Sequence, residues 1–319
     1  MSLSSREAYR RELAEIARED CRIVCLELDL GGQNHPFEAA HPDRFFNMGI
    51  AELATIDIAA GLAKAGFIPF MSTFAAFAAL RAAEGLKLAM GYMGSNVKVA
   101  APYAGVAGAW FGATHHCLED LAILQSIPGI RILAPYGEEE TRRAVRCAAM
   151  ESGPFYIRLG RNGIFHSLDR PAHQALDEVL WDEGSPLGTQ SKVCLISVGE
   201  IGTAVCLQIR DERRDLPHAH LCSLDHKSLK KAILDLRPRF QKFLVVEEHR
   251  PLGGIGSSLA LMMPDRMVYS HNCGESWPAE GGGHEELLEN LGFGVRQAMA
   301  QIKKIERGSD ELLIFPAGS

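Results

Sequence analysis

The sequence lacks the features that mark membrane, secreted and nucleic-acid-binding proteins. Its 319 residues contain no apolar run of 18, and the N-terminus has neither the cationic start nor the apolar core of a signal peptide. The 33 lysines and arginines are outnumbered by 40 aspartates and glutamates, which gives a formal charge of -7, and no basic block reverses this balance. We therefore expect a cytoplasmic protein that contacts neither a membrane nor a nucleic acid.

The cysteines also lack a functional pattern. None of the eight belongs to a Cys-x-x-Cys pair, and most fall in apolar segments typical of strands or helices. This distribution indicates buried, reduced thiols and gives no disulfide framework or zinc-binding motif. We expect no metal ligands in this chain.

What the sequence does contain is a repeated alternation of short apolar segments with helical patterns, in two series. The expected strands cover residues 23–28, 45–50, 68–74, 97–103, 130–135 and 155–159, and then 193–198, 220–224, 243–247 and 267–271. Such alternation predicts an α/β fold with a mainly parallel sheet flanked by helices in each of two domains.

The boundary between the two series is marked by composition. From about residue 164 to 190 the pattern breaks into proline, glycine, histidine and acidic residues. We therefore expect a first domain at residues 1–165, a linker at 166–190 and a second domain at 191–319. Near the N-terminus, Ser4 and Glu7 form a capping box that predicts a helix to about residue 19.

One glutamate has an unusual setting. Residues 45–50 predict a buried strand that leads directly into a helix, with Glu52 in its first turn. A first-turn carboxylate is favoured by the helix dipole, which is the ordinary interpretation. However, Ile50, Leu53 and Ile56 leave little polar surface to solvate a charge, and this favours a specific hydrogen-bonding partner.

A long ordered series of motifs is similar to the transketolase family. It begins with Arg-Phe-Phe-Asn-Met-Gly-Ile-Ala-Glu at residues 44–52 and Ile-Pro-Phe-Met-Ser-Thr-Phe-Ala-Ala-Phe at 68–77. Further matches lie at 96–98, 112–115, 118–120, 153–154, 156–161, 245–249, 253–256 and 274–276. Nearly the whole chain resembles the pyrimidine-binding and C-terminal domains of transketolases, especially the separate C-terminal subunits of split transketolases.

The resemblance implies a cofactor role for Glu52. In the family, this glutamate hydrogen-bonds a pyrimidine nitrogen of thiamine diphosphate and favours the imino form, which removes the thiazolium proton. Phe77, with Phe74 beside it, is expected to stack on the pyrimidine, and Ile50 is expected to contact the cofactor. Core packing is the alternative for both phenylalanines. The family's third aromatic, one turn later, is Leu80 here.

The glycine-rich segment 104–116 follows an expected strand, which is the usual position for ligands in α/β sheets. The resemblance implies that His115 contacts the sugar near its reacting oxygens and that His116 has a weaker substrate role. The alternative for His115 is a polar residue satisfied by its neighbours.

The resemblance also implies that Arg161 binds a substrate phosphate, a task that suits its guanidinium fork. A surface ion pair is the alternative. Asp29 and Gln33 are assigned to the same substrate site, although a serine that often assists in the family is replaced near Gln33.

Two segments depart from the family pattern. Where the family has Gly-Glu-Asp-Gly, this chain has Ala-Trp-Phe-Gly at residues 109–112. Phe111 thus replaces an acid that would hydrogen-bond a sugar hydroxyl, so we expect a less hydroxylated donor or acceptor. The second departure, Gly281-Gly282-Gly283, is typical of a flexible insertion and receives no role.

A family motif is missing altogether. Thiamine diphosphate enzymes hold Mg²⁺ and the diphosphate with a Gly-Asp-Gly sequence and a later asparagine, and this chain contains no Gly-Asp-Gly. The resemblance therefore implies half of an active site. A separate N-terminal, diphosphate-binding transketolase subunit would supply the magnesium ligands, in a dimer of heterodimers.

Three functional hypotheses follow. The first is an enzyme subunit that transfers a two-carbon ketol unit between a ketose and an aldehyde, and the strings at 112–115 and 156–161 favour it. The second is a relative that acts on 2-oxo acids, such as a 2-oxo acid dehydrogenase β subunit or a deoxyxylulose phosphate synthase. The third is a noncatalytic scaffold, which would have no reason to retain Glu52.

Overall fold

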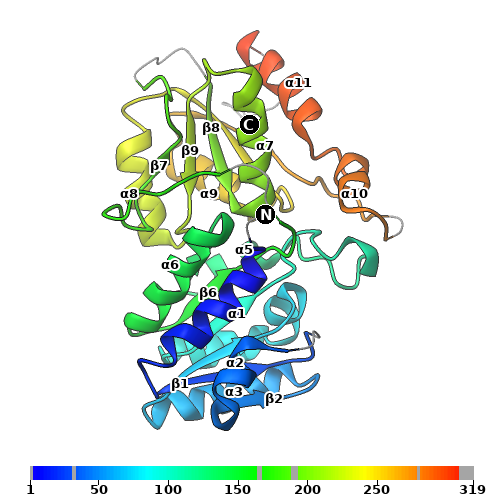
Figure 1. The fold of residues 1–319 in the computed structure, drawn as a ribbon. Coiled ribbons are helices and arrows are strands. Elements are labelled where there is room, and N and C mark those ends of the chain that lie inside the picture. The colour runs from blue at the N-terminus through cyan, green and yellow to red at the C-terminus, as the bar shows by residue number, and fades with distance from the viewer. Residues whose placement is uncertain (1–2, 31–33, 164–166, 188–192, 279–280, 309–319) are drawn as a thin grey trace.

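The computed structural model describes residues 3–30, 34–163, 167–187, 193–278 and 281–308, and it contains two sheets, one above the other in Figure 1. The first sheet has six parallel strands in the order β2-β1-β3-β4-β6-β5. Its strands are β1 (Ile23–Glu27), β2 (Phe45–Asn47), β3 (Ile68–Ser72), β4 (Lys98–Ala101), β5 (Arg131–Leu133) and β6 (Phe155–Arg158). The parallel α/β architecture predicted from the sequence is confirmed.

Helices cover both faces of this sheet because alternate side chains of each strand point to opposite sides. Val24 and Leu26 pack in the apolar cluster formed with α3 (Glu52–Lys64) and α5 (Asp120–Gln125). Ile23 and Cys25 pack on the other side. That side is covered by α1 (Ser5–Ile16), α2 (Pro36–Ala40) and α6 (Gly137–Met150).

Two local sequence signals have different outcomes. The predicted cap of α1 is present, since the Ser4 hydroxyl accepts a hydrogen bond of 3.3 Å from the Glu7 N–H. The prediction of a buried strand at 45–50 is wrong, because β2 ends at Asn47 and its residues are half-buried or exposed. The reason is position: among the strands that the structure describes, β2 pairs with β1 alone and forms the edge of the sheet.

The second sheet has the order β11-β10-β8-β9-β7, and only β7 is antiparallel to its neighbour. Its strands are β7 (Leu180–Trp181), β8 (Val193–Val198), β9 (His218–Leu221), β10 (Lys242–Glu247) and β11 (Met267–His271). One face packs against α7 (Gly199–Glu212) and α11 (Val295–Glu306), and the other against α8 (His226–Leu236) and α9 (Ile255–Met262). α10 (His284–Asn290) lies before α11. β7 falls inside the segment expected to be a linker, so that segment contributes a strand as well as a connection.

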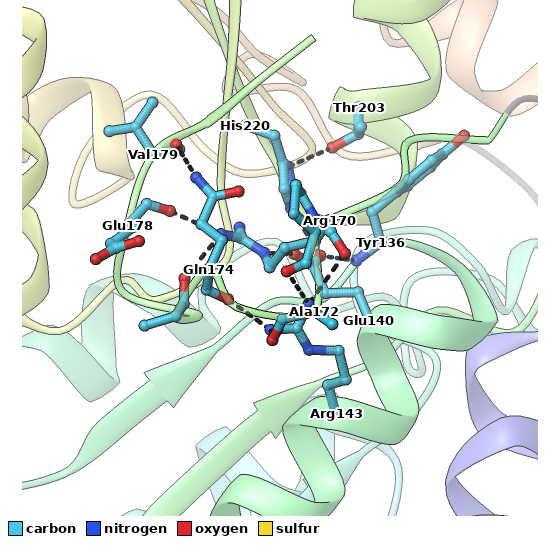
Figure 2. A network of polar contacts seen from close by, with 12 residues as sticks. Tyr136, Glu140, Arg143, Arg170, Ala172, Gln174, Glu178, Val179, Thr203 and His220 are labelled. Atoms are coloured by element: carbon cyan, nitrogen blue, oxygen red, sulfur yellow. Dashed lines mark hydrogen bonds and ion pairs between the residues drawn. The ribbon is translucent and has the colours of Figure 1, made fainter. Parts of the chain in front are cut away.

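The connecting segment is fixed to both domains by a polar network (Figure 2). Arg170 donates to a Glu140 carboxylate oxygen at 2.7 Å, and His220 Nε2 lies 2.9 Å from the other oxygen of that carboxylate. All three side chains are buried. Burial alone would raise the pKa of Glu140, but His220 and Arg170 outweigh burial and hold the pKa at about 2. The carboxylate therefore remains ionised between the domains.

Backbone hydrogen bonds also join the two domains. The Ala134 N–H donates to the Cys222 carbonyl at 2.7 Å, and the Leu224 N–H donates to the Ile132 carbonyl at 2.8 Å. The end of β5 is thus extended by residues that follow β9. The domains share this ladder, which fixes their relative orientation more firmly than side-chain contacts alone.

All eight cysteines are free thiols, and six of them are buried, as predicted. Among the described residues, no helix combines the length and apolar character that a bilayer-spanning helix needs.

Candidate active site

Glu52 lies at the carboxyl edge of the first sheet, where open α/β sheets usually bind ligands. A turn with Gly49 at φ +64° leads from β2 into α3, which begins at Glu52. The Glu52 side chain is only 5% exposed. Its carboxylate accepts a hydrogen bond of 3.2 Å from the Arg81 guanidinium. The first turn of α3 therefore holds a buried carboxylate with a cationic partner.

The predicted aromatic residues lie together beside this carboxylate. Phe77 is half-buried at the start of the π-helical segment η2 (Phe77–Arg81), and its ring centroid is 5.5 Å from that of the buried Phe74. The His115 ring lies 5.0 Å from Phe77 and 5.2 Å from Phe74. The structure thus brings the histidine to two rings that lie 38 and 41 positions before it in the sequence.

Arg81 connects the carboxylate to the aromatic pair, and the sequence reasoning missed it. Its guanidinium carbon lies 3.8 Å from the Phe77 ring centroid while the same group bonds Glu52. The signal was present, since a cation four residues after an aromatic on a helical segment can cover its ring. Arg81 is itself 49% exposed.

The position of Arg81 tests whether Glu52 and Phe77 fit the family's cofactor. A planar, nitrogen-bearing cation lies on Phe77 and donates to Glu52. An aminopyrimidine offers the same pair of contacts, a flat face for the phenyl ring and an N–H for the carboxylate. The residues present therefore fit the ring of thiamine diphosphate.

The apolar neighbours of Glu52 differ from expectation. Ile56 is fully buried, but Ile50 is 72% exposed and Leu53 and Ile58 are each 45% exposed. Apolar side chains were expected around Glu52, and this is wrong for Ile50 and Leu53 in the chain alone, although the carboxylate itself is buried. The helical period of α3 turns Leu53 and Ile58 outward, whereas Ile50 precedes that helix. Leu80, Leu88, Tyr92 and Met93 are also exposed on the following helical segments. Contiguous exposed apolar side chains are typical of an interaction surface.

The His115 ring is positioned by an aromatic neighbour. The Phe111 ring stacks on it with centroids 4.5 Å apart and an interplanar angle of 21°. His115 Nδ1 also lies 2.9 Å from the Thr114 hydroxyl. Burial and the nearby Arg81 lower the pKa of His115, so the imidazole is neutral near pH 7. A neutral ring can both donate and accept hydrogen bonds.

Two guanidinium groups meet at one tyrosine. Arg161 donates to the Tyr103 hydroxyl at 3.2 Å, and Arg6 donates to the same oxygen at 2.9 Å. Tyr103 follows β4 with φ +62°, an uncommon conformation for a residue other than glycine. Its ring packs 4.6 Å from Phe74. Two adjacent cations form a suitable site for an anionic substrate group.

Arg6 was also missed by the sequence reasoning. It lies in the first turns of α1, 155 positions before Arg161, and no local pattern distinguishes it from its basic neighbours. Only the packing of α1 across the sheet brings it to Tyr103.

The remaining predicted substrate residues have different surroundings. His116 is 5% exposed, and its pKa is lowered by burial. Phe111 is 41% exposed. Asp29 is exposed just beyond β1, with φ +45°. Gln33 lies outside the described residues.

The base of the glycine-rich segment 104–116 is held from both sides. Gly105 and Cys117 exchange backbone hydrogen bonds of 2.9 and 2.7 Å, which closes the loop. From the second domain, the Glu248 carboxylate accepts a hydrogen bond of 2.9 Å from the Val106 N–H. The second domain thus helps to position the loop that carries His115.

One further polar cluster lies under the opposite face of the first sheet. The ligand atoms of Cys25, Glu27 and His35 all lie within 4.8 Å of one another, a spacing that could hold a metal ion. The buried Arg10 already pairs with Glu27. This ion pair accounts for the buried carboxylate without a metal ion.

The fold and the site at its carboxyl edge define an α/β protein with a pyrimidine-binding domain. Residues 1–164 match the family model described as the transketolase pyrimidine-binding domain. The chain belongs to the transketolase family, as the sequence motifs predicted. Use of thiamine diphosphate follows from membership of this family.

The relatives that match include separate subunits. A putative transketolase C-terminal section from Methanocaldococcus jannaschii is 31% identical over 264 residues, 80% of each chain. One subunit of an apulose-4-phosphate transketolase from Phocaeicola vulgatus is 29% identical over 83% of this chain and 85% of its own. Among solved structures, a split-gene transketolase described as an inactive β4 tetramer superposes with a TM-score of 0.77 at 31% identity, covering 96% of this chain and 99% of its own.

Proposed function

We propose that this chain is one half of a thiamine diphosphate-dependent transketolase, which transfers a two-carbon ketol unit from a ketose to an aldehyde. One observation carries the proposal: Arg81 bonds Glu52 and lies on Phe77, the two contacts that an aminopyrimidine would make, and these residues border exposed apolar side chains. Glu52 and Phe77 would hold only the pyrimidine end of the cofactor.

Within this half, Glu52 holds and releases a proton at a pyrimidine nitrogen. Phe77 and Phe74 provide a flat surface for the ring, and the exposed Ile50 covers its edge. Bound thiamine diphosphate would supply the nucleophilic carbon that attacks the ketose carbonyl. Arg81 occupies the same two contacts in the chain alone, so it moves aside when the ring enters.

The substrate side combines one neutral imidazole with two cations. His115 binds the oxygen atoms at the reacting carbonyl, donating or accepting as required. Arg6 and Arg161 bind an anionic group such as a phosphate at the far end of the substrate. The name of the Phocaeicola relative includes a phosphorylated sugar, which supports an anionic substrate here as well.

The missing half is assigned to a partner. We infer a separate diphosphate-binding subunit that supplies the ligands for Mg²⁺ and covers the apolar surface around Ile50, Leu53 and Ile58, in a dimer of heterodimers. The solved split-gene relative is described as inactive when assembled from β chains. That description supports an activity that requires both subunits.

The test is co-expression with a chain that carries Gly-Asp-Gly, followed by assay of ketol transfer from xylulose 5-phosphate. Glu52→Gln in the reconstituted enzyme should lower kcat by about 10²-fold or more, because it removes the group that exchanges the proton. Glu38→Gln, on the exposed end of α2, is the matched control and should leave kcat unchanged.

Two outcomes would favour the other hypotheses. Unchanged turnover in Glu52→Gln would indicate a scaffold whose partner carries the chemistry. Release of carbon dioxide from pyruvate, with no transfer from ketose donors, would assign the chain to the enzymes that act on 2-oxo acids.

A further inference from the structure

We propose that the glycine segment Gly281–Gly283 of the second domain braces the turn η4 (Ala109–Phe111), and that this brace positions both His115 and Arg161 for an acceptor that carries few hydroxyl groups. The two segments that depart from the family pattern thereby form one specificity-determining element. Its effect on the acceptor rests on the proposed function, whereas its effect on His115 does not.

The two segments meet backbone to backbone. The Gly282 N–H donates to the Ala109 carbonyl at 3.3 Å. A Cβ atom at Gly281 would lie 2.7 Å from the Trp110 carbonyl oxygen and 3.0 Å from that of Ala109. Backbone atoms cannot rotate away as a side chain can, so only glycine permits this approach. Gly281 therefore has a structural reason to be glycine.

The turn presents two aromatic rings to two functional side chains. The Phe111 ring stacks on His115 at 4.5 Å. The Arg161 guanidinium carbon lies 4.4 Å from the Trp110 ring, and its other anchor is the Tyr103 hydroxyl. A cation over an indole is held in a defined orientation. A shift of η4 would therefore move the imidazole and the anion-binding guanidinium together.

The environment of His115 makes the stacking measurable. Its ring is surrounded by Phe74, Phe77 and Phe111, with Arg81 as the nearby cation. His116 follows it in sequence and its pKa is also lowered. Desolvation is the largest cause that lowers the pKa of His115. Removing the stacked ring would admit water and raise that pKa toward its ordinary value.

The same rings define the acceptor. The wall formed by Phe111 and Phe74 presents aromatic carbon beside His115, and carbon cannot accept a hydrogen bond from a substrate hydroxyl. Arg6 and Arg161 still bind an anion. These features fit an aldehyde with an anionic end and no hydroxyl at the carbon next to the carbonyl.

The brace is tested first on the full chain alone, by NMR titration of His115, whose signals are assigned with His115→Asn. Phe111→Ala should raise the pKa of His115, and Gly281→Ala should raise it in the same direction, because the displaced turn unstacks Phe111. Gly282→Ala is the matched control, since its Cβ would approach no closer than 3.5 Å, to the Glu286 carboxylate. It should leave the titration unchanged.

Unfolding curves of each variant establish that the comparison is between folded proteins. A Gly281→Ala protein that folds and titrates like the wild type overturns the brace. If Gly281→Ala does not fold, Phe111→Ala and Trp110→Ala decide. An unchanged His115 titration in Phe111→Ala then overturns the proposal, and a shift in Phe111→Ala that Trp110→Ala lacks supports it.

The acceptor is tested in the reconstituted enzyme with ribose 5-phosphate and 2-deoxyribose 5-phosphate, which differ only by the hydroxyl beside the carbonyl. The 2-deoxy compound should have kcat/KM equal to or above that of ribose 5-phosphate, and Phe111→Asp should reverse the order. Gly281→Ala should lower kcat/KM for both about tenfold, because the displaced turn moves His115 and Arg161 together. A strong wild-type preference for ribose 5-phosphate, or an unchanged kcat/KM in Gly281→Ala, contradicts the acceptor assignment. A shifted His115 titration without any ketol transfer would instead refute the proposed function and leave the brace standing.

Discussion

Two regions each contain a buried carboxylate: the cofactor edge, which is the carboxyl edge of the first sheet around Glu52, and the junction between the two domains around Glu140. They differ in how fully the chain itself surrounds the carboxylate. At the junction, Glu140 contacts the buried Arg170 and His220, and backbone hydrogen bonds join the same two domains. At the cofactor edge, Glu52 contacts the half-exposed Arg81, and apolar side chains around it face solvent. The contrast indicates that the chain alone satisfies the carboxylate at the junction, whereas the cofactor edge leaves apolar side chains that a further molecule could cover.

The largest expected effect on stability comes from removing the buried ion pair at the junction. Glu140→Gln leaves Arg170, whose side chain is 1% exposed, without its negative partner, and should lower the free energy of unfolding by about 3–5 kcal/mol. Asp265→Asn, which removes an exposed partner of Arg237, should cost far less, because solvent screens an exposed ion pair. Denaturant unfolding monitored by circular dichroism measures both. Equal losses of unfolding free energy in the two variants would mean that the buried ion pair at the junction stabilises the fold no more than an exposed one.

The stability of the chain should depend on pH through Glu140 at the same junction. The pKa of Glu140 is about 2 in the folded chain against an ordinary value of 4.5, so the folded state binds fewer protons than the unfolded state between these values. The contribution to stability is complete above pH 4.5 and is lost as the pH falls toward 2, on the order of 3 kcal/mol in total.

The difference in unfolding free energy between wild type and Glu140→Gln isolates this contribution from other carboxylates. It should narrow as the pH is lowered from 6 to 3. A constant difference over that interval would show that Glu140 is not held ionised by Arg170 and His220.

A substitution at the cofactor edge should weaken association with the partner subunit more than it lowers the unfolding free energy of the isolated chain. Leu53→Asp, on the exposed face of α3, should change the unfolding free energy of the isolated chain by less than about 1 kcal/mol. It should weaken association with the partner subunit at least tenfold, because it puts a charge into an apolar interface. Sedimentation of mixed subunits measures this association.

The matched control is Leu234→Asp, since Leu234 is 79% exposed on α8, away from the cofactor edge. It should leave association unchanged. If both variants weaken association equally, the partner does not bind at the face of α3.

Arg81 should give the smallest effect. Arg81→Ala removes a guanidinium that covers Phe77 and bonds Glu52, so thiamine diphosphate should bind a few times more tightly to the reconstituted enzyme. Calorimetric titration measures the affinity, with Lys87→Ala as an exposed control six positions later. Weaker binding in Arg81→Ala would show that Arg81 supports the ring instead of giving way to it.

The strands and the first helix could be predicted from the sequence, because they depend on local periodicity and capping. Every expected strand is present, and the cap at Ser4 forms. The exception is the segment around Phe45, where an apolar run forms a half-exposed edge strand. An apolar run in the sequence does not show whether its side chains pack in the core or lie on a surface that another molecule could cover.

The site could be predicted only where a motif carried it. The Phe77 and His115 rings lie 5.0 Å apart, and Arg81 connects Glu52 to Phe77, while the roles of these residues stay predictions. Arg6 could not be found, because its place at Tyr103 depends on how α1 crosses the sheet. Gly281 was assigned no role, since its contact with Trp110 joins segments 171 positions apart.

The central claim is that this chain holds half of a cofactor site, and calorimetric titration of thiamine diphosphate with Mg²⁺ tests it most directly. The isolated chain should show no tight binding, and the same chain mixed with a Gly-Asp-Gly subunit should bind tightly and lose that binding when magnesium is chelated. Tight, magnesium-dependent binding by the isolated chain would contradict the claim.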